Sequence, residues 1–243
     1  MKTRKLRLVS ALLAVAMMLA LLPTAAFAED STESNIITYN CGENGNNSVV
    51  ATLDTVTGTL TISGTGAMKD YNNILNLDQP WLSQRDSIKH LVVENGVTSI
   101  GKNAFANCRS LETVELPQNG VLETIKYNAF SWSDSSSVGA GITEITIPKS
   151  VKTIEAYAFD GCTKLATVIF AKGSQLNVVE YDAFRNCSDV TIYYSDENVK
   201  TRLSGIVDAD RIKLLTPTVT FVSNGGSNVE PATVKNGEKI SAP

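Results

Sequence analysis

The only histidine of the chain limits the hydrolytic chemistry that the chain can support. A serine-hydrolase triad would have to use His90, and the sequence has no Gly-x-Ser-x-Gly turn to carry a nucleophile. A zinc site would need His90 together with cysteines that are scattered along the chain. In the alternating segment around it, Leu91 and Val93 face inward, so we interpret His90 as a solvated strand residue.

Three of the four cysteines follow an Ala-Phe pair by the same spacing, namely Cys108, Cys162 and Cys187. Equivalent positions of a repeat stack, which predicts a ladder of small buried side chains that is interrupted at Ser133. Cys162 and Cys187 belong to adjacent copies, and their Cα atoms could approach the roughly 5–6 Å that a disulfide needs. Parallel side chains disfavour this bond, and Cys41 has no evident partner.

Carboxylates are numerous but dispersed. Glycoside hydrolysis needs two of them about 5–9 Å apart in a cleft, and Glu115 and Glu144 could be lateral neighbours on a sheet, close to this range. An exposed sheet provides neither the desolvation that raises the pKa of an acid nor a pocket for a sugar ring. We therefore interpret both as surface charges and expect no catalytic residue, no metal site and no cofactor.

A repeat with a period of 23 residues positions all of these side chains. Nine positions coincide between the segments Ile88–Leu111 and Ile142–Leu165. Those of the second segment, before the restart at Leu165, are Ile142, Ile145, Ile147, Val151, Ile154, Ala158, Phe159 and Cys162. A period in the 20s with strand-like spacing is typical of a leucine-rich solenoid.

Two further copies carry insertions. The copy that starts at Leu111 has two extra residues before Ile125 and six more before Ile142, in a serine-rich loop at 131–141. The copy that starts at Leu165 has two extra residues. Each copy predicts a short strand, and neighbouring strands pair in parallel about 4.8 Å apart. At least three copies must stack, and both ends must be capped.

Both caps have sequence signals. Residues 49–54 and 59–63 alternate around a Thr-Gly turn and predict a β-hairpin, and Pro80 opens a short helical lead into the first coil. The closing elements are predicted to be a fifth strand, a short helix and a last strand, at 190–194, 197–206 and 211–215. The fold class is therefore a β-rich α/β solenoid, a short stack of coils with a hairpin as N-cap.

The N-terminus predicts a secretory signal peptide over 1–28. A basic start is followed by the apolar run 8–22 and the small-x-small site 26–28, and the run is too short for a membrane span, which needs about 20 residues. An uncleaved anchor is the weaker alternative. Cleavage leaves 17 basic and 25 acidic side chains, a balance that nucleic acid and anionic membranes repel. We expect a secreted or cell-surface protein with no membrane span after cleavage.

The run Ile-Pro-x-x-Val-x-x-Ile-x-x-x-Ala-Phe-x-x-Cys at 147–162, with its variants over roughly 88–195, resembles the BspA-type leucine-rich repeats of bacterial surface proteins. Cys41-Gly42, the run 59–68 and Pro80-Trp81 are similar to the leader found before such repeats. The resemblance implies adhesion to host or matrix proteins or to other cells. It is specific for the fold and not for a ligand.

A second resemblance begins after Thr216. Residues 219–227 and 234–240 are similar to the first half of a Listeria–Bacteroides (internalin B-type) repeat, whose aromatic-rich second half is absent before Pro243. This favours a fragment of a longer protein, the alternative being a frayed strand pair. The predicted domains are a signal peptide (1–28), a leader and cap (29–87), the solenoid with its C-cap (88–215) and an incomplete repeat (216–243).

The outward strand positions are the candidate binding residues: His90, Val92, Glu94, Thr113, Glu115, Glu144, Thr146, Thr167 and Ile169. A solvated sheet whose residues are chosen for β-propensity is the alternative. Trp132 is either a contact residue in its loop or packing, and we favour packing. We expect a non-catalytic module that binds an extracellular or cell-surface protein, or a glycan. The alternative is an accessory domain of a larger secreted enzyme.

Overall fold

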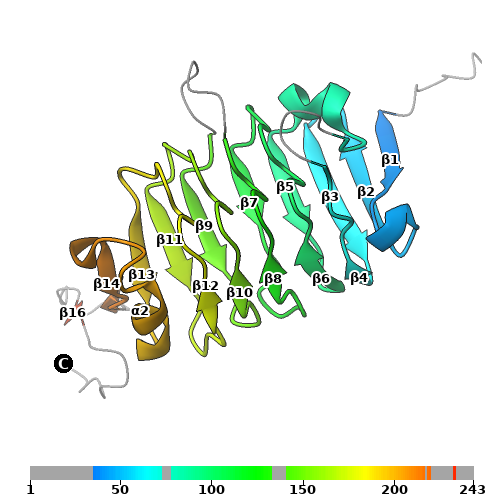
Figure 1. Cartoon of the computed structure of the whole chain (residues 1–243). Helices are drawn as coiled ribbons and strands as arrows, with labels where there is room; N and C mark the ends of the chain where they lie inside the picture. Colours follow the sequence, from blue (N-terminus) through cyan, green and yellow to red (C-terminus); the bar gives the residue numbers. More distant parts are fainter. Residues whose placement is uncertain (1–34, 73–77, 133–140, 217, 220–231, 234–243) are drawn as a thin grey trace, which may run out of the picture. The chain divides into compact units, whose positions relative to one another are not determined.

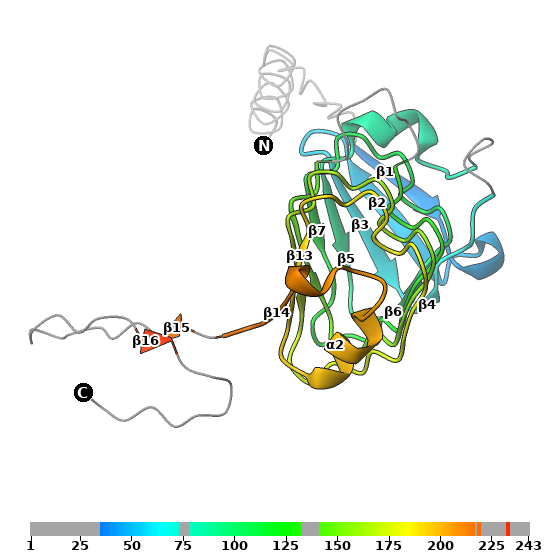
Figure 2. The same cartoon turned by 60° about the vertical axis from the view of Figure 1, so that its left-hand side comes forward.

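The computed structural model describes residues 35–72, 78–132, 141–216, 218–219 and 232–233, which fall in one structural unit. Successive coils stack along the chain, and most coils contribute a strand to each of two β-layers (Figure 1, Figure 2). We call the layer with the longer strands the front sheet and the other the back sheet. The predicted β-rich solenoid is confirmed, whereas the predicted signal peptide lies outside the described residues.

Along each repeat strand of the front sheet, buried apolar residues alternate with outward residues, which are Thr, Glu, Val, Ile, His and Tyr, as the sequence predicts. Its strands are β1 (Ile36–Asn40), β2 (Val49–Asp54), β3 (Thr59–Gly64), β5 (His90–Val93), β7 (Thr113–Glu115), β9 (Glu144–Ile147), β11 (Thr167–Phe170), β13 (Thr191–Tyr194) and β14 (Ile212–Leu214). Hydrogen bonds join them in two groups, a five-stranded β1-β2-β3-β5-β7 and a four-stranded β9-β11-β13-β14. The repeat strands pair in parallel within each group.

The back sheet is one unbroken parallel ladder. Its members are β4 (Gly66–Ala67), β6 (Val97–Ile100), β8 (Thr124–Ile125), β10 (Thr153–Ile154) and β12 (Val178–Val179), which are neighbours in this order. β6, β8, β10 and β12 arise from the second apolar segment of each copy, whose inward members, such as Ile125 and Ile154, are fully buried, whereas β4 precedes the first copy. The ladder keeps all coils in register on this side of the solenoid.

The Ala-Phe pairs form the third side of each coil. Phe105, Phe130, Phe159 and Phe184 stack with ring centroids 5.3–5.5 Å apart, and Trp81 extends the stack at 5.6 Å from Phe105. The residue before each Ala-Phe pair adopts a positive φ, and these residues are Asn103, Asn128, Tyr157 and Asp182. Asn and Asp tolerate this conformation at low cost, whereas an aromatic side chain in it is uncommon.

Both ends of the stack are covered as predicted. The hairpin β2–β3 adds β1 on its outer side, and the lead into the first coil is a 3₁₀ helix, η2 (Leu82–Ser87). At the other end α2 (Glu197–Leu203) buries Val199 and Leu203, and β14 closes the sheet on β13. Two shorter 3₁₀ turns are η1 (Glu43–Gly45) and η3 (Ala209–Arg211).

Past residue 216 the structure describes only β15 (Thr218–Val219) and β16 (Ala232–Thr233), which pair antiparallel. The rest of the predicted Listeria–Bacteroides-type repeat lies outside the described residues. None of the helices in the described part of the chain is long and apolar enough to span a membrane.

Candidate functional site

The candidate binding residues lie on one surface, which we call the front face. Eight of the nine are outward residues of β5, β7, β9 and β11, and Glu94 follows the end of β5. All are exposed or half-buried, whereas the residues that alternate with them, such as Leu91 and Val168, are buried. These residues therefore share one outward face, and their role in binding stays a prediction. The front face falls into two parts, because β7 and β9 belong to different hydrogen-bonded groups.

The front face is also larger than predicted. Because β3 pairs with β5 in parallel, the hairpin of the N-cap continues the sheet, and Thr61 lies beside Val92. At the other end Tyr193 lies beside Ile169. Further outward residues are Thr38, Thr52, Thr59 and Thr191. The alternation in Thr59-Leu60-Thr61 carries this signal, but it falls outside the 23-residue repeat.

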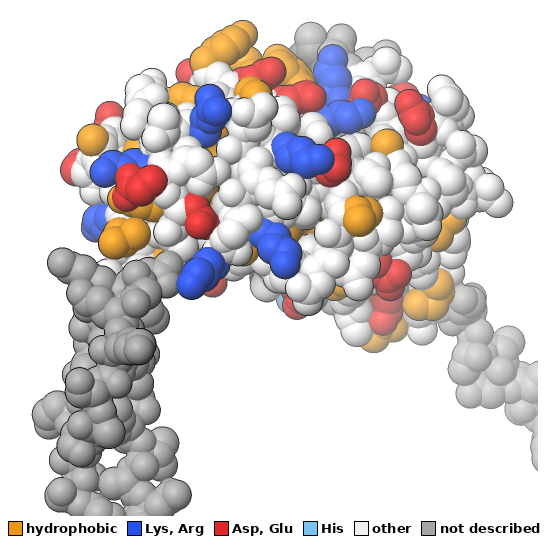
Figure 3. Space-filling model, turned by 90° about the horizontal axis from the view of Figure 1, so that it is seen from below, with side chains coloured by type: hydrophobic (Ala, Val, Ile, Leu, Met, Phe, Trp, Pro, Cys, Tyr) orange, Lys and Arg blue, Asp and Glu red, His pale blue; other side chains and the backbone are white. Residues whose placement is uncertain are grey.

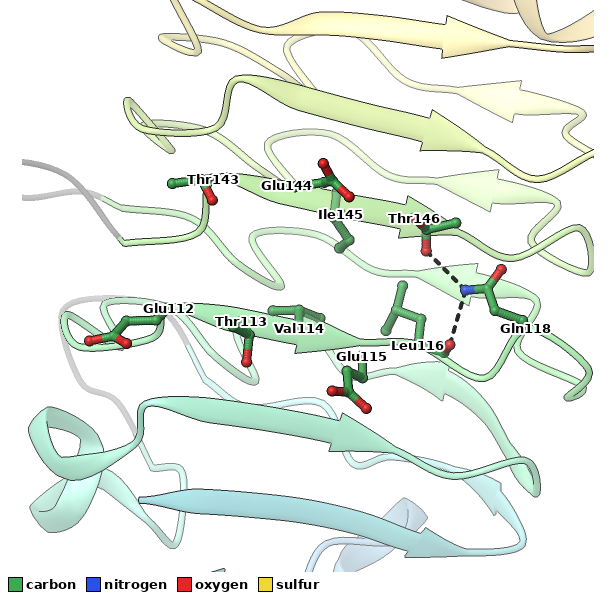
Figure 4. Close-up of a pocket in the computed structure, with 10 residues that line it drawn as sticks. All are labelled: Glu112, Thr113, Val114, Glu115, Leu116, Gln118, Thr143, Glu144, Ile145 and Thr146. Atoms are coloured by element: carbon green, nitrogen blue, oxygen red, sulfur yellow. Dashed lines mark hydrogen bonds between the residues drawn. The ribbon is translucent and has the colours of Figure 1, made fainter. Parts of the chain in front are cut away.

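A groove separates the two parts of the front face (Figure 4). Its cavity volume is about 500 Å³. It lies between β7 and β9, and Gly141 approaches the carbonyl oxygen of Leu111 before these strands begin. The lining residues are Glu112, Thr113, Val114, Glu115, Leu116, Gln118, Thr143, Glu144, Ile145 and Thr146. The sequence predicted parallel pairing at every step of the stack, and at this step the prediction is wrong.

The length of one coil explains the break. From Leu111 to the equivalent Ile142 there are 31 residues, compared with 23 from Ile88 to Leu111. The back sheet stays paired across the same step, with Thr124 beside Thr153. The coil is therefore fixed on the back side and separated from its neighbour on the front side. An insertion of two residues does not have this effect, because β11 and β13 pair normally across the coil that starts at Leu165.

Gln118 spans the groove after the end of β7. Its side-chain Nε2 donates to the carbonyl oxygen of Leu116 at 3.0 Å and to that of Thr146 at 3.3 Å (Figure 4). One amide group thus joins the two strand edges where a backbone ladder would otherwise run. Gln118 was not among the residues predicted from the sequence, because its partner Thr146 is 28 positions away.

The groove has an apolar floor and an acidic rim. Val114, Leu116 and Ile145 are at most 8% exposed, whereas Glu112, Glu115 and Glu144 are exposed. Neither lysine nor arginine is among the lining residues. A cation that enters the groove therefore meets carboxylates without a competing positive charge.

The suggested pair Glu115 and Glu144 does not form. Counted from Leu111 and Ile142, Glu144 is equivalent to Thr113 and not to Glu115, so the expectation of lateral neighbours is wrong. The two carboxylates lie on opposite sides of the groove and point away from each other (Figure 4). This arrangement is unlike the facing pair that a glycosidase uses.

His90 is engaged on the sheet surface. Its Nδ1 lies 2.9 Å from the hydroxyl oxygen of Thr113 on the adjacent strand, and the side chain is half-buried. Within the described ranges, no cluster of three or more His, Cys, Asp or Glu side chains could hold a metal ion. The interpretation of His90 as a strand residue agrees with its position in β5.

Trp132 is buried, with 7% of its surface exposed. The guanidinium of Arg109 lies 5.5 Å from its ring, and its backbone amide donates to the carbonyl oxygen of Asp160 at 2.7 Å. Its position matches the packing alternative and leaves little of the ring for a partner. The rest of the serine-rich loop, 133–140, lies outside the described residues, as does the predicted interruption of the cysteine ladder at Ser133.

All four cysteines are free and buried. The thiols of Cys162 and Cys187 point to the preceding coil, where they donate to the carbonyl oxygens of Phe130 (3.3 Å) and Phe159 (3.1 Å). Burial raises the pKa of the Cys41, Cys108 and Cys187 thiols to about 12. At neutral pH the folded chain therefore holds thiols and not the reactive thiolates.

Thiol labelling tests this description. A thiol-specific colorimetric reagent at pH 8 is expected to label no cysteine of the folded chain, because burial blocks access and suppresses the thiolate. In denaturant the same reagent should find four thiols, with or without prior reduction. Two thiols before reduction and four after it would show a disulfide and contradict the structure.

Charges elsewhere on the surface are mixed in sign. Figure 3 shows Lys and Arg side chains interspersed with Asp and Glu on the face seen from below. Ion pairs join neighbouring coils, for example Lys126 with Asp70 at 2.8 Å and Lys152 with Glu123 at 2.6 Å. The described residues of this face form no continuous basic patch of the kind that binds nucleic acid.

Comparison with known proteins agrees with the repeat. A profile of the BspA type leucine rich repeat region matches residues 79–202, with 6 copies. The chain belongs to the BspA-type leucine-rich repeat family. Four complete copies, two of them with insertions, and the start of a fifth are visible in the sequence over roughly 88–195, so the family profile recognises more of the chain as repeat.

Three solved structures illustrate the likeness. A leucine-rich repeat protein from Eubacterium ventriosum is 26% identical, with a TM-score of 0.47, over 67% of this chain and 45% of that chain. The leucine rich repeat protein of T. pallidum is 20% identical, with a TM-score of 0.38, over 59% and 67%. A leucine rich cell surface protein from Faecalibacterium prausnitzii is 18% identical, with a TM-score of 0.28, over 66% and 55%.

The chain spans less than half the length of the first of these proteins. Among curated proteins, none matches this chain. The family accounts for the stack of coils and its β-rich architecture.

Proposed function

We propose that the chain is the binding module of an exported bacterial protein and attaches to an extracellular or cell-surface protein through its front face. The observation that carries the proposal is the front face itself. Its outward side chains, from Thr61 through Val92 to Ile169, are partly exposed, whereas the residues that alternate with them are buried in the core. The half-buried Val92 and Ile169 offer apolar contact, and the nearby exposed glutamates offer charge-assisted hydrogen bonds.

We also propose that this module is non-catalytic. Among the described residues, the hydrogen bond of the His90 ring is to the hydroxyl of Thr113, and the Glu115 and Glu144 carboxylates point apart. Catalysis requires reacting groups held at hydrogen-bond distance around a substrate, and neither arrangement provides this. The positions of His90, Glu115 and Glu144 therefore support a module that binds a partner rather than one that converts a small molecule.

Export is part of the same proposal. The basic start, apolar run and Ala-Phe-Ala site of residues 1–28 support secretion, and the excess of acidic residues after cleavage keeps the module away from anionic membrane surfaces. A secreted or surface-held module meets extracellular proteins and cell-surface glycans, and the flat front face is better suited to a protein than to a single sugar ring.

A binding screen with matched variants tests the proposal. The chain without its predicted signal peptide is applied to an array of extracellular proteins and glycans, and each ligand found is titrated. Changing Val92 and Ile169 together to aspartate should weaken binding by at least about tenfold, because the double change replaces two apolar contacts of the front face by charges. Val178→Asp is the control, because Val178 is an exposed strand valine of the back sheet.

Two outcomes would contradict the proposal. One is a well-folded chain, checked by circular dichroism, that binds nothing on the array. The other is a ligand whose affinity falls as much with Val178→Asp as with the front-face double variant, which would place its site elsewhere on the solenoid.

A further inference from the structure

We propose that the groove between β7 and β9 binds an extended, basic peptide segment of a protein partner, which adds as a strand to the open edges of the front sheet. This inference rests on the proposed function and specifies the chemistry of the ligand at one part of the front face. It follows from the backbone, from one side-chain amide and from the charges around the groove.

At the other steps of the repeat, backbone hydrogen bonds join neighbouring coils just before their front strands begin. These hydrogen bonds are missing at the groove. The carbonyl oxygen of Lys89 accepts from the amides of Glu112 (2.7 Å) and Thr113 (3.2 Å), and that of Thr143 accepts from Ala166 (2.9 Å) and Thr167 (3.1 Å). The equivalent acceptor at the groove is the carbonyl of Glu112, with Thr143 and Glu144 as donors. No such bond occurs among the described residues.

The backbone groups along the groove face each other without forming a ladder. The backbone groups of Thr113 on β7 point to β5, and the carbonyl of Thr143, which accepts from Thr167, points to β11. Because successive residues of a strand direct their N–H and C=O groups to opposite edges, the backbone groups of Val114 and Glu144 point into the groove. An open strand edge of this kind is a template for another extended chain. Addition of a peptide strand to a sheet edge is a recurrent mode of recognition.

Gln118 shows that an amide fits between the two edges. Its Nε2 donates at once to the carbonyl oxygen of Leu116 on the β7 side and to that of Thr146 on β9. These are contacts that a peptide N–H would make there. An incoming strand would displace the Gln118 side chain, which is exposed and therefore can turn into solvent.

The side chains around the groove select the type of peptide. Buried Val114, Leu116 and Ile145 form an apolar floor that suits an aliphatic side chain. The exposed Glu112, Glu115 and Glu144 flank the groove on both sides, and their negative charge attracts lysine or arginine and repels aspartate or glutamate. Because alternate residues of a strand point to opposite sides, a segment that alternates basic and aliphatic residues satisfies both.

The back sheet provides the fixed side about which the groove opens. A whole strand between β7 and β9 needs them about 9.6 Å apart, which is twice the spacing of neighbouring strands. Thr124 stays paired with Thr153 and Ile125 with Ile154, so the coils remain joined at the back while the front strands separate. The inserted peptide then restores one continuous front sheet.

The first test uses three blocked peptides with the chain that lacks the predicted signal peptide. One alternates lysine and valine over seven residues, the second replaces each lysine by glutamate, and the third is the lysine peptide N-methylated at every valine. Fluorescence anisotropy should give a dissociation constant at least about tenfold lower for the first than for the others. The third peptide keeps the charge and loses backbone donors, so it separates strand addition from charge attraction alone.

The second test locates the site. Glu144→Lys should weaken binding of the lysine–valine peptide about tenfold, whereas Glu43→Lys, the same change at an exposed position of η1 in the N-terminal cap, should alter it less than about twofold. Hydrogen exchange should show new protection of the Val114 and Glu144 amides when the peptide is bound. Equal affinity for all three peptides, or equal losses in the two variants, would overturn the proposal.

The outcomes also separate this inference from the proposed function. If a ligand from the array is weakened by the Val92 and Ile169 changes while the lysine–valine peptide does not bind, the front face keeps its function and the groove proposal is wrong. If neither the array nor the peptides give binding to a folded chain, both proposals fail.

Discussion

Replacing Phe159 by alanine is expected to lower the free energy of unfolding by about 3–5 kcal/mol. The side chain is fully buried, and its ring stacks on Phe130 and on Phe184 with both centroid distances at 5.3 Å. The stacked coils are held by ladders on the back sheet, so the surrounding backbone has little freedom to collapse into the cavity. The cost should therefore fall in the upper part of the range for such substitutions.

Urea unfolding followed by circular dichroism measures this effect. Tyr181→Ala is the matched control, because Tyr181 is also an aromatic residue in a row across coils but is 67% exposed. Its loss should stay below about 1 kcal/mol, the value of one edge-to-face contact. Similar losses for both variants would contradict the phenylalanine stack as the main packing element of the third side.

The front strands could be predicted because their signal is local. Apolar residues two apart, such as Leu91 and Val93, define the inward face, and the 23-residue period then places equivalent strands side by side. The caps were predictable for a related reason: the hairpin turn at Thr57-Gly58 has a positive φ at Gly58, which glycine adopts without strain.

The groove could not be predicted, although its cause is visible in the sequence. The extra residues between Leu111 and Ile142 can be counted, but the count does not say whether they leave the coil as a loop or separate its strands. The coil from Leu165 also has an insertion and pairs normally. Whether the front strands separate depends on the side of the coil on which the extra residues lie, and packing between neighbouring coils decides this.

The candidate pair Glu115 and Glu144 illustrates how sensitive a site prediction is to register. A strand presents alternate residues on one face, so both glutamates were correctly placed outward. Which residue of β7 each one is equivalent to depends on the number of residues between Leu111 and Ile142. This number makes Glu144 equivalent to Thr113 and not to Glu115. Gln118 follows Pro117, one residue beyond the repeat motif, and only the three-dimensional structure brings its amide to Thr146.

The insertion links the architecture to the proposed function. A solenoid with identical coils satisfies all strand edges except the two at its ends, where caps cover them. One longer coil opens a pair of edges in the middle of the stack, while the unbroken back sheet maintains the fold. If the groove binds a partner as we propose, the longer coil provides a local site while the back sheet keeps the coils joined.

Replacing Gly161 by alanine is expected to lower the free energy of unfolding by about 2–5 kcal/mol, from two additive causes. Gly161 has a φ of +74°, where an L-residue is strained by about 1–2 kcal/mol. A Cβ at this position would also clash with the carbonyl oxygen of Trp132 in the longer coil, and relieving such a clash costs about 1–3 kcal/mol.

Gly173→Ala separates the two causes. Gly173 has a similar φ of +81°, but a Cβ there would meet no atom within 4 Å, so its loss should be limited to about 1–2 kcal/mol. Gly161→Asn provides the converse test, since asparagine already occupies the equivalent positive-φ sites at Asn107 and Asn186. If Gly161→Asn is as destabilising as Gly161→Ala, contact with Trp132 is the main cause; a nearly stable asparagine variant would show instead that backbone strain dominates.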